Sequence, residues 1–160
     1  MEGFASEPII LSSAEKILQL EDYAEMSDLD YTNYTGAGFV EISTKMNRKI
    51  KIPIFLQKAG RYILDFRYSN GSGPWNTGNS CAIRSLKVNK NYCGVIVFPQ
   101  RGTDEWSDWG YSNSVVIELN KGENTLSLQL DTFNKNMNGQ INTAMLDTMR
   151  LRLIENLDNK

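Results

Sequence analysis

The sequence of 160 residues contains no histidine. Histidine is the commonest general base, the usual partner of a nucleophilic serine or cysteine, and the commonest transition-metal ligand. The absence of histidine does not exclude catalysis by a pair of carboxylates, or binding of a metal such as calcium through oxygen ligands. An acid pair would have to come from Asp104, Glu105 or Asp108 facing Asp131, and no spacing fixes such a pair. We therefore expect this chain not to be an enzyme.

Cysteine is scarce, with two residues, Cys81 and Cys93. They flank a predicted tight turn at 89–90. A hairpin folded there places Cys93 opposite Leu86 rather than Cys81. The Cα atoms of the two cysteines are then too far apart for a disulfide. The sequence therefore predicts two free thiols, and cysteine usage does not indicate a cellular compartment.

The chain also lacks a net positive charge and long apolar runs. A formal charge of −2 and a pI of about 5.2 argue against a nucleic-acid surface, which needs clustered positive charge. No apolar run reaches the ~18 residues that span a bilayer. Residues 1–8 lack the basic start and apolar stretch of a signal peptide and are expected to be a tail.

Alternation of apolar and polar residues dominates what is present. Apolar residues in 61–68 alternate with Arg61, Asp65 and Arg67, which is typical of a half-buried strand. Pro53 lacks a backbone N–H, so its strand is expected at a sheet edge. Residues 12–30 could form a helix, but their apolar spacing and later Tyr and Thr residues favour a strand. The other predicted strands cover 50–56, 95–98, 115–119, 126–130 and 149–153.

Many short strands with regular turns predict an all-β fold, a two-sheet antiparallel β-sandwich of the jelly-roll kind, with 1–160 as a single domain. In antiparallel strands, every other connection lies at the same end. Rigid scaffolds present functional loops, so the end with long loops is the expected binding end. The short turns are 57–60, 89–90 and 120–123, and the long loops are 70–80, 99–113 and 131–145.

All three tryptophans, Trp75, Trp106 and Trp109, lie in these long loops among Asn, Gln, Asp and Arg residues. A pyranose ring has an apolar face that lies on an aromatic plane, and its hydroxyls need amides and carboxylates. The mixture is therefore typical of a sugar-binding site. The alternative is that a loop tryptophan packs down as a lid on the core with its N–H bonded to backbone.

Inward carboxylates suggest a further site. Asp147 has the alternation of Met149 and Leu151, so it is expected to point toward the core, and Gln19 and Glu21 share the alternation of Ile17. A buried carboxylate must be neutralised or hydrogen-bonded. Calcium bound by these oxygens would do so, and so would loop amides capped by the Asp147 carboxylate. The residue pattern favours the amides.

The sequence resembles the family 35 and family 6 carbohydrate-binding modules, which share a galactose-binding-like β-sandwich. The closest match is Ala-Gly-Arg-Tyr-Ile-Leu-Asp-Phe-Arg-Tyr-Ser-Asn-Gly at 59–71. The resemblance covers about 18–154. The other matching segments are 20–24, 34–40, 106–109, 115–126 and 146–151.

The resemblance implies a non-catalytic carbohydrate-binding module, part of a larger glycan-degrading enzyme that it targets to polysaccharide outside the cell, in the periplasm or on the cell surface. It implies a structural Ca2+ on Glu21 and Asp147, with Gln19 where the family has a glutamate. It also implies one tryptophan that stacks on the sugar ring, assigned to Trp109, with Tyr34 as a second wall. The long loops add four further candidate saccharide-binding residues: Trp106, Trp75, Asn138 and Asn142.

One departure from the family pattern leaves an alternative open. Met145 stands where the family often has an asparagine two residues before its final aspartate. This change favours a second hypothesis, a structural β-sandwich domain that packs against a glycoside hydrolase catalytic domain and binds no sugar.

Overall fold

The computed structural model describes residues 9–11, 15–73, 80–136 and 142–157. Within these ranges it contains strands and a single short 3-10 helix. No described helix is long and apolar enough to cross a membrane. The elements are β1 (Ile9–Leu11), β2 (Glu15–Gln19), η1 (Leu20–Asp22), β3 (Val40–Ile42), β4 (Lys49–Leu56), β5 (Gly60–Ser69), β6 (Ala82–Val88), β7 (Asn91–Phe98), β8 (Gly110–Tyr111), β9 (Val115–Leu119), β10 (Gly122–Gln129) and β11 (Ala144–Asn156).

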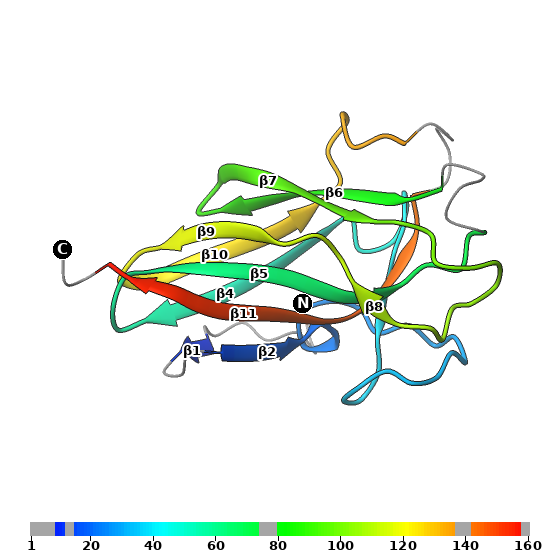
Figure 1. Ribbon diagram of the computed structural model, residues 1–160, viewed down its shortest axis with the longest axis horizontal. Helices are drawn as coiled ribbons and strands as arrows, with labels where there is room; N and C mark the ends of the chain where they lie inside the picture. Colours follow the sequence, from blue (N-terminus) through cyan, green and yellow to red (C-terminus); the bar gives the residue numbers. More distant parts are fainter. Residues whose placement is uncertain (1–8, 12–14, 74–79, 137–141, 158–160) are drawn as a thin grey trace.

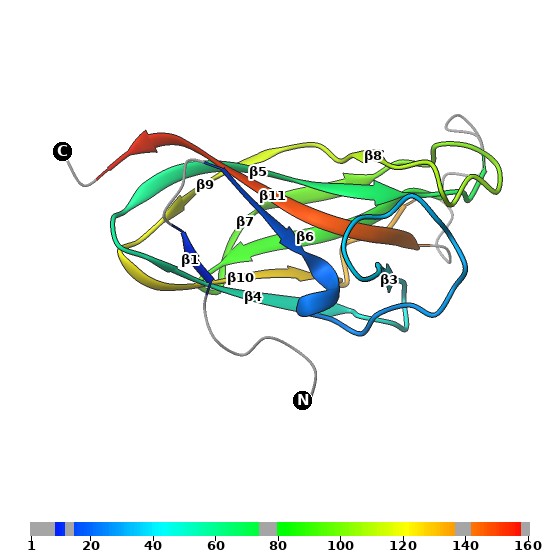
Figure 2. The same cartoon turned by 90° about the horizontal axis from the view of Figure 1, so that it is seen from below.

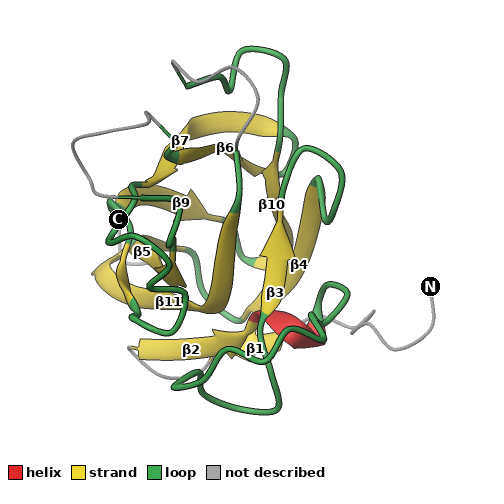
Figure 3. Cartoon of the chain, turned by 90° about the vertical axis from the view of Figure 1, so that its right-hand side faces the viewer, coloured by secondary structure: helices red, strands yellow, loops and turns green. Residues whose placement is uncertain are grey.

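The strands form two sheets that face each other. One has the order β1-β4-β10-β6-β7, and the other has the order β2-β11-β5-β8, with β3 also paired to β11 and β9 to β5. Figures 1 and 3 show the two layers from the side and from one end. All pairs are antiparallel except β1 beside β4. The predicted two-sheet β-sandwich is confirmed.

Alternating side chains of both sheets fill the space between them. On β4, Ile50, Ile52 and Ile54 are buried while Lys49 and Lys51 are exposed. Aromatic residues of β5 and β7 meet edge to face, with the rings of Tyr68 and Phe98 5.2 Å apart. Removing this apolar surface from water, at roughly 25 cal/mol per Å², holds the layers together.

Three details differ from the sequence expectations. Pro53 lies on β4, which is not an edge strand over Ile54–Leu56, because β1 pairs with that part. The strand expected within 12–30 is present as β2, but it ends at Gln19, and the chain turns into η1. Ile17 is 51% exposed, because Leu18 and Leu20 take the core positions instead.

The short turns and long loops lie at opposite ends, as predicted. In Figure 1 the turns that join β4 to β5, β6 to β7 and β9 to β10 lie at the left, and the described parts of the three long connections lie at the right. Figure 2 shows the connection from η1 to β3 at the same right-hand end. The turn between β6 and β7 has positive φ at Asn89 and Lys90, as tight hairpin turns require.

The two cysteines are free thiols, as predicted. Their expected register is wrong by one residue. Leu86 is opposite Gly94, because a bulge between Leu86 and Lys87 makes Cys93 the extra residue of β7. A bulge of this kind cannot be read from alternation alone.

Candidate functional site

A cluster of aromatic rings lies at the long-loop end, between the η1–β3 connection and the β7–β8 loop. Phe39, which is 2% exposed, is at its centre. The Phe39 ring is 5.4 Å from Tyr34, 5.9 Å from Tyr31 and 5.7 Å from Trp109. Tyr31 in turn stacks on Trp106 at 5.8 Å with an interplanar angle of 13°. The structure therefore gathers Tyr34, Trp106 and Trp109, as the sugar-site hypothesis requires.

Trp109 is anchored within this cluster. Its indole N–H donates to the Thr32 carbonyl at 2.7 Å. The Arg67 guanidinium carbon lies over its ring, 5.5 Å from the centroid. Trp109 is only partly exposed. This is the backbone-bonded arrangement that the sequence left open as the alternative, and it fixes the orientation of the indole.

Trp106 is held from two sides. Tyr31 covers one part of the ring, and Gly71 approaches so closely that a β-carbon there would lie 2.7 Å from the indole Cδ1. The Trp106 carbonyl accepts a hydrogen bond from the Ser69 hydroxyl at 2.8 Å. Gly71 thus permits the loop after β5 to pass against the indole.

Tyr34 is the most exposed ring of the cluster, at 37%. Its loop is pinned to the β7–β8 loop by hydrogen bonds. The Ser107 hydroxyl accepts the Thr32 N–H at 2.8 Å, and the Ser107 carbonyl accepts the Asn33 side-chain amide at 3.2 Å. An exposed ring on a pinned loop loses little freedom when a ligand binds, which favours affinity.

Asp147 is fully buried, but strand alternation is not the reason. It is the extra residue of a bulge in β11, between Leu146 and Thr148. Its Oδ2 accepts hydrogen bonds from Arg67 at 2.6 Å and from the Thr35 hydroxyl at 2.9 Å, and its Oδ1 accepts the Thr35 N–H at 3.0 Å. The bulge thus turns the carboxylate toward Arg67 and the 33–38 loop. The carboxylate is neutralised within the protein itself and also caps a loop amide.

Gln19 and Glu21 lie against the same loop. Glu21 Oε2 accepts the N–H groups of Ala37 at 3.0 Å and Gly38 at 3.3 Å, and the Gln19 amide lies 3.1 Å from the Thr35 hydroxyl. Gly36 between them has a φ of +68°, and a β-carbon there would lie 2.6 Å from Glu21 Oε2. Glycine is required here both for the backbone conformation and for space.

This cluster holds two carboxylates, Glu21 and Asp147, and the described residues contain no group of three or more His, Cys, Asp or Glu side chains that could hold a metal ion. Glu21 Oε1 is buried and has no hydrogen-bond partner. Burial raises the pKa of the Glu21 carboxyl, and the loop N–H groups only partly oppose that rise. An orphaned carboxylate oxygen beside the Gln19 amide and the Thr35 hydroxyl suits an oxygen-ligated ion such as calcium. The fit is incomplete at Asp147, whose charge Arg67 already compensates.

The remaining predicted residues lie elsewhere. Asn142 is buried in a separate network, where its Oδ1 accepts bonds from Arg84 and from the Ile83 N–H, and its amide donates to the Asn134 carbonyl. Trp75 and Asn138 fall outside the described residues. Met145 is buried and pairs with Glu41 and Ser69, so it offers no polar group to a ligand.

Sequence reasoning missed three contributors. Tyr31 and Phe39 carry the aromatic cluster, and Arg67 both neutralises Asp147 and lies over Trp109. Arg67 does carry a signal, because it is a charged residue on the outer face of an otherwise well-patterned strand. The tryptophan partners, Trp106 of Tyr31 and Trp109 of Phe39, come from a distant loop of the chain, and no periodicity connects them.

No protein-family model matches the chain. It is 31% identical, over 76% of its length, to a cycloisomaltooligosaccharide glucanotransferase of Niallia circulans, of which it spans 11%. A solved family 35 carbohydrate binding module from Clostridium thermocellum is similar with a TM-score of 0.64 and 22% identity, over 87% of this chain and 98% of that one.

A third similar protein is a solved Paenibacillus cycloisomaltooligosaccharide glucanotransferase complexed with cycloisomaltoheptaose. Its TM-score is 0.60 with 21% identity, over 92% of this chain and 20% of that one. The chain thus matches small parts of the glucanotransferases and nearly the whole of an isolated module. The resemblance predicted from the sequence is confirmed at the level of architecture: this chain has the fold of the family 35 carbohydrate-binding modules.

Proposed function

We propose that this chain is a non-catalytic saccharide-binding module that holds a larger enzyme on an α-1,6-linked glucan. The observation that carries the proposal is the aromatic cluster at the long-loop end, where Tyr34, Trp106 and Trp109 gather around Phe39. Partly exposed rings beside amides and hydroxyls suit the apolar face and the polar edge of a pyranose.

Two further findings support this function. The chain covers only about a tenth of the glucanotransferase relative, which is the expected relation of a module to its parent enzyme. The relative's name and the cyclic isomaltooligosaccharide in the Paenibacillus complex both point to α-1,6-linked glucose as the ligand class. The proposal includes that the module acts outside the cell, where a glucan too large to cross a membrane would be met.

The binding test uses isomaltoheptaose and titration calorimetry. We expect Tyr34→Ala to weaken binding about tenfold, because one aromatic contact contributes about 0.5–1.5 kcal/mol beyond its buried area. Trp109→Ala should weaken binding and also lower the melting temperature, since Trp109 packs on Phe39 and bonds to Thr32. Tyr92→Ala is the matched control, an exposed tyrosine on β7 next to the short turn.

Failure to bind isomaltoheptaose or any other neutral glucan would favour the structural alternative. In that case the chain packs against its catalytic neighbour and binds no sugar. The specific observation behind this second candidate is Met145, which is buried and replaces a polar ligand of the family pattern. Equal losses in Tyr34→Ala and Tyr92→Ala would also contradict the proposed site.

We assign no catalytic role to the chain itself. A general acid needs a carboxyl whose pKa is raised. Asp131, the expected partner in an acid pair, has the opposite shift, because a hydrogen bond from Gln129 and the charges of Lys87 and Lys49 lower its pKa. Asp108 pairs with Arg101 at 3.5 Å. Turnover of a chromogenic glucoside by the purified chain would contradict this assignment.

A calcium ion at Glu21, Gln19 and Asp147 is part of the proposal. A metal bound only by the native state stabilises it, by about 2.7 kcal/mol at a free concentration of 100 Kd. We therefore expect chelator to lower the melting temperature by about 5 °C or more. Calorimetry with 1 mM calcium against EDTA measures the difference, and an unchanged melting temperature would remove the ion from the proposal.

Glu21→Gln sharpens this test. The folded-state pKa of Glu21 is raised, so its contribution to stability is present below the unfolded pKa and is lost as pH rises through the folded pKa. In EDTA at pH 7, Glu21→Gln should therefore match or exceed the wild-type melting temperature. In calcium it should gain nothing, whereas the wild type should gain. A calcium shift that survives in Glu21→Gln would place any ion elsewhere.

A further inference from the structure

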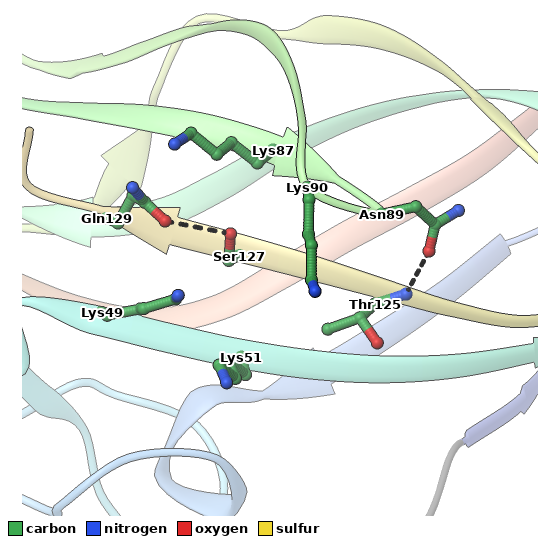
Figure 4. Close-up of a pocket in the computed structure, with 8 residues that line it drawn as sticks. All are labelled: Lys49, Lys51, Lys87, Asn89, Lys90, Thr125, Ser127 and Gln129. Atoms are coloured by element: carbon green, nitrogen blue, oxygen red, sulfur yellow. Dashed lines mark hydrogen bonds between the residues drawn. The ribbon is translucent and has the colours of Figure 1, made fainter.

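A concave surface lies away from the aromatic cluster, on the outer face of the five-stranded sheet. It is a hollow of about 500 Å³ that we call the basic groove. Figure 4 shows its side chains rising from β4 and β10, from β6, and from the β6–β7 turn. The groove is lined by Lys49, Lys51, Lys87, Asn89, Lys90, Thr125, Ser127 and Gln129.

Strand register explains why the lysines gather. Ser127 on the central strand β10 pairs with Lys51 on one side and with Lys87 on the other. One step along, Gln129 pairs with Lys49. Neighbouring strands are about 4.8 Å apart, and residues two apart on one strand are about 6.8 Å apart. Lysines on the two strands beside β10 therefore flank the polar side chains of β10, which form the floor of the groove. The sheet itself therefore positions the charges.

The basic groove is unusual in an acidic protein. It contains four of the 17 lysine and arginine residues of a chain whose formal charge is −2. A carboxylate at one end is the partial exception: Asp131 lies 4.0 Å from Lys87 and accepts a hydrogen bond from Gln129 at 2.7 Å. Like charges held side by side repel each other, and an anionic ligand relieves that repulsion.

We propose that the basic groove is a binding site for an anionic polysaccharide, distinct from the neutral-glucan site at the long-loop end. Lysine ammonium groups act as point charges toward carboxylate, sulfate or phosphate groups on a sugar chain. The Thr125 and Ser127 hydroxyls and the Gln129 amide line the groove and can exchange hydrogen bonds with sugar hydroxyls, whereas the Asn89 amide is already bonded to Asn124 and to the Thr125 N–H. This inference rests on a different surface from the proposed function and can hold without it.

Two features favour a saccharide over a nucleic acid. The lining contains no aromatic side chain, whereas proteins that bind single strands stack bases on aromatic rings. The polar floor is made of short hydroxyl and amide side chains of one strand, and one of them, Ser127, is buried. A flat row of hydroxyl partners between charges suits a ribbon-like sugar chain.

The experiment measures binding of polygalacturonate, dextran sulfate and neutral dextran to the full chain at 50 mM and 300 mM salt. We expect both anionic polymers, or one of them, to bind at low salt and to weaken at high salt. The double variant Lys51→Gln/Lys87→Gln should weaken anionic binding about tenfold or more. It should leave isomaltoheptaose binding unchanged, because the long-loop end does not include these residues.

The matched control is Lys58→Gln/Lys121→Gln, which removes the same charge from two exposed turn lysines outside the groove. Retained affinity in this control, with loss in the groove variant, supports the groove. Equal losses in both, or no anionic binding by the wild type, would overturn it. Tighter binding of a single-stranded oligonucleotide than of either polymer would also overturn it.

Discussion

Arg84→Ala is expected to destabilise the protein by about 3 kcal/mol or more, enough to lower the melting temperature by roughly 6–12 °C. Arg84 is 1% exposed and lies on the same face of β6 as the buried Ala82 and Leu86. Its described partners are neutral oxygens: those of Asn142, Ile83 and Ser43. Alanine removes this donor from all of these oxygens, although Asn142 Oδ1 keeps the Ile83 N–H. A buried acceptor left without a donor costs more than the lost hydrogen bond itself.

Two features of its surroundings disfavour the charge of the buried Arg84 guanidinium. Burial and the nearby Arg48 lower the pKa of Arg84 to about 10, so the group stays charged at neutral pH. Its Nε lacks a hydrogen-bond partner. Arg48→Ala is the matched control, since it removes an exposed arginine and a repulsion and should be neutral or slightly stabilising. Urea unfolding measures both variants, and a loss below about 1 kcal/mol for Arg84→Ala would show that water can replace the guanidinium.

Arg84 also shows where pattern-based prediction stops. The hairpin turn predicted at 89–90 implies a strand before it, and the structure has that strand as β6. Alternation gives no reason for an arginine on the inner face, because its partners come from the chain before β4 and before β11. The face of a residue can thus be predicted from its neighbours in sequence, but its partners depend on the fold.

The same division applies to the candidate site. The expectation that the long loops share one end followed from counting antiparallel connections, and it is confirmed. The expected direction of Asp147 failed, because a bulge inserts one residue and breaks the alternation. Likewise β3 and β8, with three and two residues, are too short to show any period. Long periodic strands were predictable, whereas bulges and short strands were not.

Arg67→Met is expected to cost about 3–5 kcal/mol, because it leaves the fully buried Asp147 carboxylate without its cation. Methionine keeps much of the length and apolar contact of the arginine stem, so the change mainly removes the charge and its hydrogen bonds. Arg67 also donates to the Asn33 carbonyl at 3.2 Å and lies over Trp109. The variant should therefore loosen the loop that presents Tyr34 and weaken saccharide binding as well.

A double-mutant cycle separates the ion pair from these other contacts. Asp147→Asn alone leaves the Arg67 guanidinium without its carboxylate partner. Because Arg67 is partly exposed and water can solvate its charge, this change should cost less than Arg67→Met. In the double variant no buried charge remains, and its destabilisation should be smaller than the sum of the two single changes by about 1 kcal/mol or more. Added calcium should restore part of the stability of Arg67→Met if an ion binds beside Asp147. Strict additivity in chemical unfolding would mean that the pair contributes nothing and that Arg67 acts through Trp109 and Asn33.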